Sequence, residues 1–195
     1  VSDTSFSDLN HLGSLGVEFR MRTAVGQVRE GVVQTSRGDV TADTIAVAVN
    51  HDIDQLFPEL AEADDVLRCS LDMMRVELPL AAPLSAPLLT GWSLIRYSGF
   101  ATLPEAAAVR ARLHAGRPDL AGIDLNQMYT QLPDGSIVVG DSHHRSASPE
   151  PFQPETVADL LLAETEHLFG APARVIERWQ GVYASGRDEF LVAEP

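Results

Sequence analysis

The stretch from Leu132 to Ser146, LPDGSIVVGDSHHRS, constrains the fold more than any other part of the sequence. Its Asp134-Gly135 dipeptide predicts a tight hairpin turn, because glycine tolerates the positive φ that such a reversal needs. Residues 137–139 are all β-branched and are followed by Gly140, which is typical of a central strand with both faces covered. The strand then runs into a polar segment at residues 141–144, DSHH, and functional residues commonly lie where such a strand ends.

Hydrophobic periodicity elsewhere predicts several antiparallel strands and a few helices. Between Thr23 and Val49 the apolar residues alternate with polar ones, and turns at 30–31 and 38–39 separate three short strands from a final apolar strand, TIAVAV, at 44–49. Further strands are expected at 16–19, 67–78, 88–98, 126–132, 136–140 and 175–183, and helices at 6–15, 104–114 and 154–169. This pattern predicts an α+β fold, with a mixed, largely antiparallel sheet flanked by helices.

Composition limits the partners and the compartment. The net charge of -14 argues against nucleic acid and anionic membranes as partners, because both require a basic protein face. The single cysteine, Cys69, permits no internal disulfide and excludes a zinc site built from several cysteines. The sequence contains no run of about eighteen apolar residues and no leader-like segment, so it predicts a cytoplasmic protein without a membrane span. Because the chain starts without Met and stops just after a strand-like run, we expect a piece of a longer protein; its oligomeric state is not indicated.

Two kinds of site can be weighed directly at the polar end of the central strand. The segment IVVGDS at 137–142 resembles the nucleophile block of GDS-type serine esterases. A nucleophilic Ser142 would need a separate downstream Asp and His, whereas the only Asp-x-x-His, at 141–144, overlaps the serine itself. Adjacent His143 and His144 would point to opposite faces of a continuing strand, which disfavours a shared metal ion. The esterase is therefore a distant alternative, and no metal ligands are predicted.

A series of short motifs resembles a known family. In chain order the motifs are GVEF at 16–19, LFPEL at 56–60, LRCSLDMMR at 67–75, RYSGF at 96–100, DGSIVVGDSH at 134–143 and RWQGVYAS at 178–185. Together they are similar to FAD-dependent oxidoreductases of the D-amino-acid oxidase, glycine oxidase and sarcosine oxidase superfamily. Within it they resemble most a bacterial branch associated with aminophosphonate catabolism. Several motifs in one order are more specific than any single motif.

The resemblance implies a domain organisation and a cofactor. Residues 1–50 would be part of an FAD-binding lobe, 51–65 a linker, 66–183 a substrate-binding lobe, and 184–195 a return toward the FAD-binding lobe. The full-length protein would bind FAD non-covalently and oxidise a small amine or amino acid, with an aminophosphonate as candidate, by hydride transfer. The sequence has no GxGxxG segment for the FAD pyrophosphate, so that unit is expected upstream, and this chain alone is expected neither to hold FAD nor to be active. A stand-alone, non-catalytic small-molecule-binding domain is the alternative.

The resemblance also implies positions near the cofactor. Val49 and Asn50 end the apolar strand that lies beside the flavin in the family, where a glycine usually replaces Asn50. Gly181 stands where some relatives carry a flavin-linking Cys, which is why a non-covalent flavin is expected. Val138 stands where sarcosine-oxidase relatives carry a Lys that assists the reaction with oxygen, so oxygen and another electron acceptor both remain open.

The expected substrate is a small anionic amine, which requires concentrated arginine because guanidinium groups match phosphonate or carboxylate oxygens. Arg75, Arg96 and Arg178 occur in apolar, strand-like contexts, and for each a structural ion pair is the alternative to substrate contact. Arg96 is the first candidate, and Tyr183 matches a tyrosine that lies over the substrate in sarcosine-oxidase relatives. The predicted substrate-binding residues are Arg96, Tyr97, His143, His144 and Tyr183. No catalytic residue is predicted.

Overall fold

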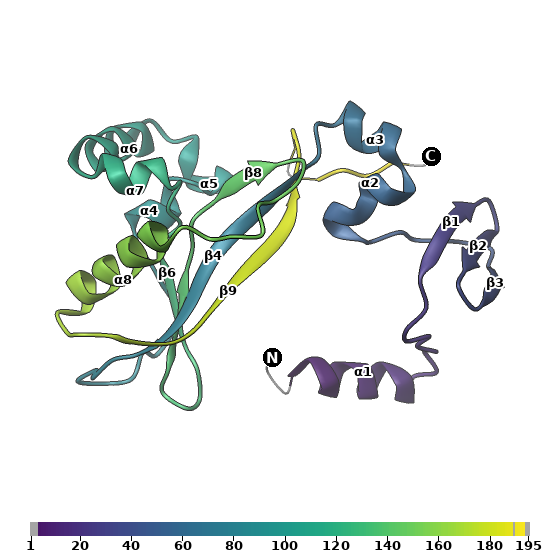
Figure 1. Cartoon of the computed structure of the whole chain (residues 1–195), viewed down its shortest axis with the longest axis horizontal. Coiled ribbons are helices and arrows are strands. Elements are labelled where there is room, and N and C mark those ends of the chain that lie inside the picture. Colours follow the sequence, from purple (N-terminus) through teal and green to yellow (C-terminus); the bar gives the residue numbers. More distant parts are fainter. Residues whose placement is uncertain (1–3, 189, 194–195) are drawn as a thin grey trace. The chain divides into compact units, whose positions relative to one another are not determined.

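The computed structural model describes residues 4–188 and 190–193 (Figure 1). The chain divides into two compact units, Val1–Val49 and Asn50–Pro195, which are described separately. The helices are α1 (Thr4–Ser14), η1 (Asn50–Asp52), α2 (Ile53–Leu56), α3 (Pro58–Ala63), α4 (Gly91–Leu94), α5 (Ser98–Ala101), α6 (Pro104–Gly116), α7 (Pro118–Gly122) and α8 (Glu155–Phe169). The strands are β1 (Val25–Arg29), β2 (Val32–Thr35), β3 (Gly38–Thr41), β4 (Leu67–Glu77), β5 (Leu88–Leu89), β6 (Met128–Gln131), β7 (Ile137–Gly140), β8 (His144–Ser146) and β9 (Arg174–Ser185). Within the described ranges, no helix has the length and apolar character needed to cross a membrane.

The first unit consists of α1 and a three-stranded antiparallel sheet of order β1-β2-β3. Gly31, in the turn before β2, and Gly38, the first residue of β3, have φ values of 70° and 103°, which glycine adopts without steric cost. Val33 on β2 pairs with Val28 on β1 and Val40 on β3, so the alternating valines lie side by side. The predicted meander of three short strands is confirmed.

Two other strands predicted in this unit are not formed. Residues 16–19 and 44–49 have no strand assignment, although their apolar residues predicted one. A strand requires a hydrogen-bonded neighbour, and neither segment pairs with a strand of the described chain. Val17 and Phe19 are accordingly exposed, at 45% and 39%. The apolar residues of these two segments favour an extended conformation, but they do not provide a neighbouring strand to pair with.

The second unit is built around a sheet of order β5-β6-β7-β4-β8, in which β9 also pairs with β4. Strands β6 and β7 form the predicted hairpin, with Tyr129 opposite Val139 and a φ of 88° at Gly135. β7 lies between β6 and β4, and its Ile137 and Val139 are buried. The pairings in this sheet are antiparallel, so the predicted fold class is confirmed and β7 is central as expected.

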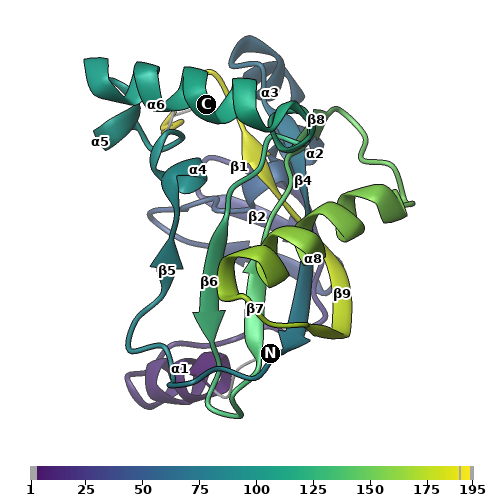
Figure 2. The ribbon, with the colours of Figure 1, turned by 90° about the vertical axis from the view of Figure 1, so that its left-hand side faces the viewer.

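One face of this sheet carries the core of the unit beneath α8, which crosses it in Figure 2. Leu161 of α8 packs into a buried cluster with Met74 and Tyr129. Each such side chain contributes about 1.5–3 kcal/mol through removal of apolar surface from water. The helix lies where it was predicted: Pro154 precedes it, and Gly170, with a φ of 64°, ends it in the left-handed conformation.

Two segments of the second unit differ from the sequence-based expectation. Residues 88–98 were predicted as a strand, but only β5 is extended and α4 follows at once. Thr90 explains the change, because its hydroxyl accepts a hydrogen bond from the Trp92 backbone N–H at 3.3 Å and caps the helix. Residues 51–65 were expected to be irregular but form η1, α2 and α3, and Pro58 occupies the favourable first position of α3.

Candidate functional site

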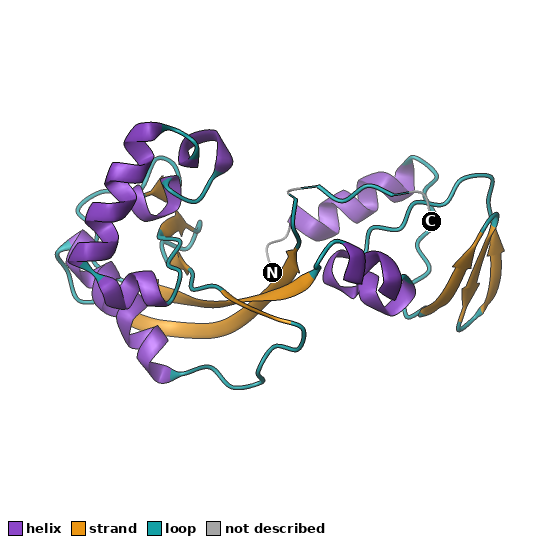
Figure 3. Ribbon diagram, turned by 90° about the horizontal axis from the view of Figure 1, so that it is seen from above, coloured by secondary structure: helices purple, strands orange, loops and turns teal. Residues whose placement is uncertain are grey.

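Alternation along β4 and β9 places a set of side chains on the sheet face opposite α8. Cys69 pairs with Tyr183 and Met73 with Trp179, and paired residues point to the same side of a sheet. We call this side the open face, because Met73 and Tyr183 are partly exposed and Trp179 is 36% exposed. The two strands form the long curved pair in Figure 3. The open face consists of Cys69, Leu71, Met73, Trp179, Gly181 and Tyr183.

Charged and polar residues gather at the Tyr183 end of the open face. The Asp124 carboxylate accepts hydrogen bonds from Arg96 and from Arg145 Nη1, the latter at 2.9 Å. Arg96 also donates to the Asp124 backbone oxygen at 3.0 Å, and His143 Nδ1 lies 3.1 Å from that oxygen. The rings of His143 and Tyr183 meet edge to face, with centroids 6.2 Å apart. We call these five residues the arginine cluster.

Strand pairing and one turn hold the cluster in place. Cys69 on β4 lies between Arg145 on β8 and Tyr183 on β9, which brings these two side chains to the same face. Asp124 lies between α7 and β6 and has a positive φ of 49°. The His143 backbone N–H donates to the Ile123 backbone oxygen at 3.0 Å and fastens this turn to the strand end.

Burial and neighbouring charges set the protonation states in the cluster. Burial raises the pKa of Asp124, but the hydrogen bond from Arg145 and the charge of Arg96 outweigh it and lower that pKa below its usual value. Burial and the Arg96 guanidinium lower the pKa of His143 to about 4. Burial and the neighbouring Cys69 raise the pKa of Tyr183 to about 12. At neutral pH, Asp124 is therefore ionised, the His143 ring is neutral, and the Tyr183 hydroxyl keeps its proton.

A second carboxylate, Asp141, lies beside the cluster in a more buried setting. Its Oδ2 is 3.9 Å from His143 Nε2, and its Oδ1 is buried without a hydrogen-bond partner among the described residues. Burial raises the pKa of Asp141 to about 6, although the charge of Arg96 opposes the rise. A buried carboxyl group with a pKa near neutrality, beside a cluster of functional type, is a candidate proton acceptor.

Three of the predicted substrate-binding residues, Arg96, His143 and Tyr183, come together in the cluster. Sequence reasoning did not identify Asp124 and Arg145 as site residues. Arg145 directly follows the histidine pair in the polar segment after the central strand, so its position was a usable signal. Asp124 carried no local signal, because its two arginine partners are 28 and 21 residues away in the chain.

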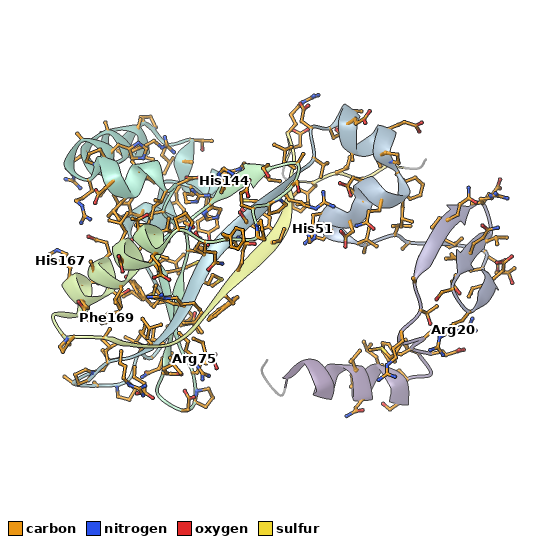
Figure 4. All side chains as sticks on the ribbon, in the orientation of Figure 1. Arg20, His51, Arg75, His144, His167 and Phe169 are labelled. Atoms are coloured by element: carbon orange, nitrogen blue, oxygen red, sulfur yellow. The ribbon has the colours of Figure 1, made fainter. Side chains whose placement is uncertain are left out.

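The other two predicted substrate-binding residues, Tyr97 and His144, form no hydrogen bond with the cluster among the described residues. Tyr97 is 44% exposed, and its hydroxyl is 3.9 Å from Met128 Sδ. His144, labelled in Figure 4, pairs with Ser70 on β4, whose side chain shares a sheet face with Asp72. Ser70, Asp72 and His144 line a cavity of about 270 Å³ on the side of α8. His143 lies before β8 and lines the same cavity, so the alternation expected for a continuing strand does not apply to the histidine pair.

The predicted cofactor-binding residues occupy three different settings. Val49 is the last residue of the first unit and is partly exposed. Asn50 has a φ of 55°, and its Oδ1 accepts a hydrogen bond from the Ala184 backbone N–H at 2.7 Å. Asn50 thus adopts the left-handed conformation that favours glycine. Gly181 lies on the open face, where an added Cβ would be 3.4 Å from Leu71 Cδ1.

The residues of this chain suit one part of FAD and not another. The open face offers partly exposed apolar atoms, the bare backbone of Gly181 and the protonated Tyr183 hydroxyl, a combination that suits contact with a flat aromatic ring. The pyrophosphate needs a glycine-rich turn at a helix N-terminus, and the sequence contains no GxGxxG segment. These residues could therefore contact a flavin ring, and they include no glycine-rich turn of the GxGxxG type for the pyrophosphate.

Ser142 does not have the surroundings of a nucleophile. Its hydroxyl donates to Asp72 Oδ2 at 2.8 Å and accepts from the Asp72 backbone N–H at 3.2 Å. In the part of the chain that the structure describes, no hydrogen bond joins this hydroxyl to a histidine, the usual activating base. Among the described residues, no group of three or more His, Cys, Asp or Glu side chains could hold a metal ion.

Arg75 and Arg178 form structural ion pairs. Arg75 Nη2 is 3.2 Å from Glu177 Oε1, and Arg178 Nη1 is 2.6 Å from Glu155 Oε2. These pairs lie outside the arginine cluster. Of the three arginines that the sequence singled out, Arg96 alone is part of the cluster.

Comparison with known proteins agrees with this fold. A family model described as FAD dependent oxidoreductase (DAO) matches residues 9–195. The structure is similar to glycine oxidase from Geobacillus kaustophilus, with a TM-score of 0.57 and 12% identity over 91% of this chain and 40% of that chain. It is also similar to glycine oxidase from Bacillus cereus ATCC 14579, with a TM-score of 0.53 and 15% identity over 85% of this chain and 38% of that chain. This chain therefore spans about two fifths of the length of these structures. A comparison with curated proteins finds no match.

Proposed function

This chain belongs to the family of FAD-dependent oxidoreductases, and we propose that it forms the substrate-binding part of an enzyme that oxidises a small anionic amine or amino acid. An aminophosphonate is the candidate that the sequence motifs favour. In the full-length protein, residues outside this chain would supply the phosphate-binding unit for FAD. The observation that carries the proposal is the arginine cluster at the end of the open face.

The cluster has the chemistry that an anionic amine requires. Arg96 and Arg145 present fixed positive charges that attract a carboxylate or phosphonate group. His143 is neutral and adds no charge that would repel a substrate ammonium group. The protonated Tyr183 hydroxyl can donate a hydrogen bond to the bound molecule. When bound, FAD would accept the hydride from the substrate carbon; this chain's residues would bind the anion and orient that carbon.

The test uses the full-length protein, with amine oxidation followed at steady state through an artificial electron acceptor that reoxidises the reduced FAD. Arg96→Ala should raise KM for an anionic amine about tenfold or more, because a charge-assisted hydrogen bond is lost, and should change KM little for a neutral amine of the same carbon skeleton. Arg75→Ala is the matched control, since it removes an arginine of β4 that lies outside the cluster and pairs with Glu177.

Three outcomes would each contradict a different part of the proposal. An equal rise of KM for anionic and neutral amines would make Arg96 a structural residue. Absence of FAD reduction by any amine or amino acid would contradict the proposed function. Flavin absorbance that stays with the purified 195-residue chain through gel filtration would refute the expectation that FAD binding needs residues outside it.

A further inference from the structure

Three residues of the arginine cluster, Arg96, Asp124 and Arg145, line a cavity of about 270 Å³ between helices α4, α6 and α7 and strand β8. Its lining includes Arg96, Arg110 and Arg145 with one acidic residue, Asp124. Three guanidinium groups less one carboxylate leave two positive charges in the cavity. Because the whole chain has a net charge of -14, this is a local reversal of sign, and it favours anions at this place.

The arginines of the cavity keep hydrogen-bond donors available. A guanidinium group carries five N–H donors. Arg110 uses Nη2 for the Ile95 backbone oxygen, and Arg96 uses Nη1 for Asp124. Their other guanidinium nitrogens form no hydrogen bonds with the described residues, yet none is among the buried unpartnered atoms, so they reach solvent. A bound oxyanion could accept from them.

The volume of the cavity and the apolar part of its lining further restrict the kind of ligand that fits. A water molecule takes up about 30 Å³ of liquid, so the cavity has room for an anion of five heavy atoms and an attached small group. Trp92 is buried in the apolar wall and stacks on His114, with ring centroids 5.8 Å apart. A carboxylate would neutralise half of the excess charge, whereas a doubly charged tetrahedral anion would neutralise all of it.

We propose that this cavity binds a tetrahedral dianion, a phosphate or phosphonate group, through Arg96, Arg110 and Arg145. Free phosphate and the phosphonate end of a substrate share this chemistry. The assignment to a substrate rests on the proposed function. Binding of the anion does not, because it involves no flavin.

Calorimetric titration of the chain with inorganic phosphate, methylphosphonate and acetate tests the proposal. Arg110→Gln is the informative variant, because Arg110 makes no hydrogen bond to Asp124 and its loss leaves the two pairs of that carboxylate in place. Arg112→Gln is the matched control, since Arg112 is an exposed residue of the same helix that does not line the cavity.

We expect saturable binding of phosphate and methylphosphonate, weakened about tenfold by Arg110→Gln and unchanged by Arg112→Gln. Acetate should bind more weakly than either. No saturable binding at millimolar phosphate, an equal loss in both variants, or acetate binding as tight as phosphate would overturn the proposal.

A second measurement needs no variant, in case Arg110→Gln prevents folding. Phosphate should slow modification of Arg96 and Arg110 by phenylglyoxal, followed by mass spectrometry, and should leave Arg112 unaffected. Equal modification with and without phosphate would contradict the proposed site. In the full-length protein, phosphate that competes with an anionic amine but not with a neutral one would support the substrate assignment. Absence of competition would overturn that assignment and leave free phosphate as the ligand.

Discussion

Asp141 is predicted to destabilise the folded second unit at neutral pH, and Asp141→Asn to stabilise it. The Asp141 side chain is 8% exposed, and its Oδ1 has no hydrogen-bond partner among the described residues. Burial raises its pKa from the ordinary 3.8 to about 6. The folded state therefore binds this proton more tightly than the unfolded state, and ionisation of Asp141 above its folded pKa costs stability.

The magnitude follows from the pKa difference. A change from 3.8 to about 6 corresponds, at about 1.36 kcal/mol for each pKa unit, to about 3 kcal/mol. The contribution of the Asp141 carboxyl group to the unfolding free energy is fully present below pH 3.8 and is lost as the pH rises through about 6. The new amide also needs partners, which costs about 1–2 kcal/mol. The net gain from Asp141→Asn should thus be about 1–2 kcal/mol above the folded pKa, and the gain should fall, to zero or below, as the pH falls toward 3.8.

His143 makes the unfolding free energy depend on pH in the opposite direction. Its effect must be separated from that of Asp141. Its pKa falls from 6.5 to about 4, so its contribution is complete above pH 6.5 and is lost as the pH falls through about 4. The two dependences oppose each other in the unsubstituted chain. The difference in unfolding free energy between Asp141→Asn and the unsubstituted chain removes most of the His143 contribution and isolates Asp141.

Urea unfolding followed by tryptophan fluorescence measures this difference. Both tryptophans, Trp92 and Trp179, lie in the second unit, so the signal reports on that unit. Asp159→Asn, at an exposed position of α8, is the matched control and should change stability little at any pH. A stability difference for Asp141→Asn that does not change with pH, or a loss of stability at neutral pH, would refute the reasoning.

Two further predictions concern the stability of the second unit. Arg117→Ala should lower the unfolding free energy by about 1–3 kcal/mol, since it leaves the Glu164 carboxylate, 11% exposed, without its arginine partner; an unchanged urea midpoint would show that water satisfies Glu164. Gly170→Ala should cost about 1 kcal/mol, because the residue ending α8 has a φ of 64°, and a thermal midpoint equal to that of the unsubstituted chain would contradict this account.

Local signals predicted the elements whose conformation depends on nearby residues. The hairpin at Asp134-Gly135, the meander of 25–41 and α8 were found from turn residues, alternation and helix-end residues, and the structure confirms them. The predicted strand at 88–98 was wrong, because the cap formed by Thr90 outweighed the strand propensity of the residues that follow. The predicted strands at 16–19 and 44–49 were wrong, because a strand depends on a partner that local sequence does not specify.

The sequence by itself determined the fold class and, through the order of its motifs, the family to which the chain belongs. It also pointed to Arg96, His143 and Tyr183, but as separate residues. Only the tertiary structure decided that Asp124 joins Arg96 to Arg145, and that the ring of His143 meets the ring of Tyr183. The physical reason is distance: hydrogen bonds and ion pairs act over a few ångströms, so residues far apart in the chain interact only after folding brings them together.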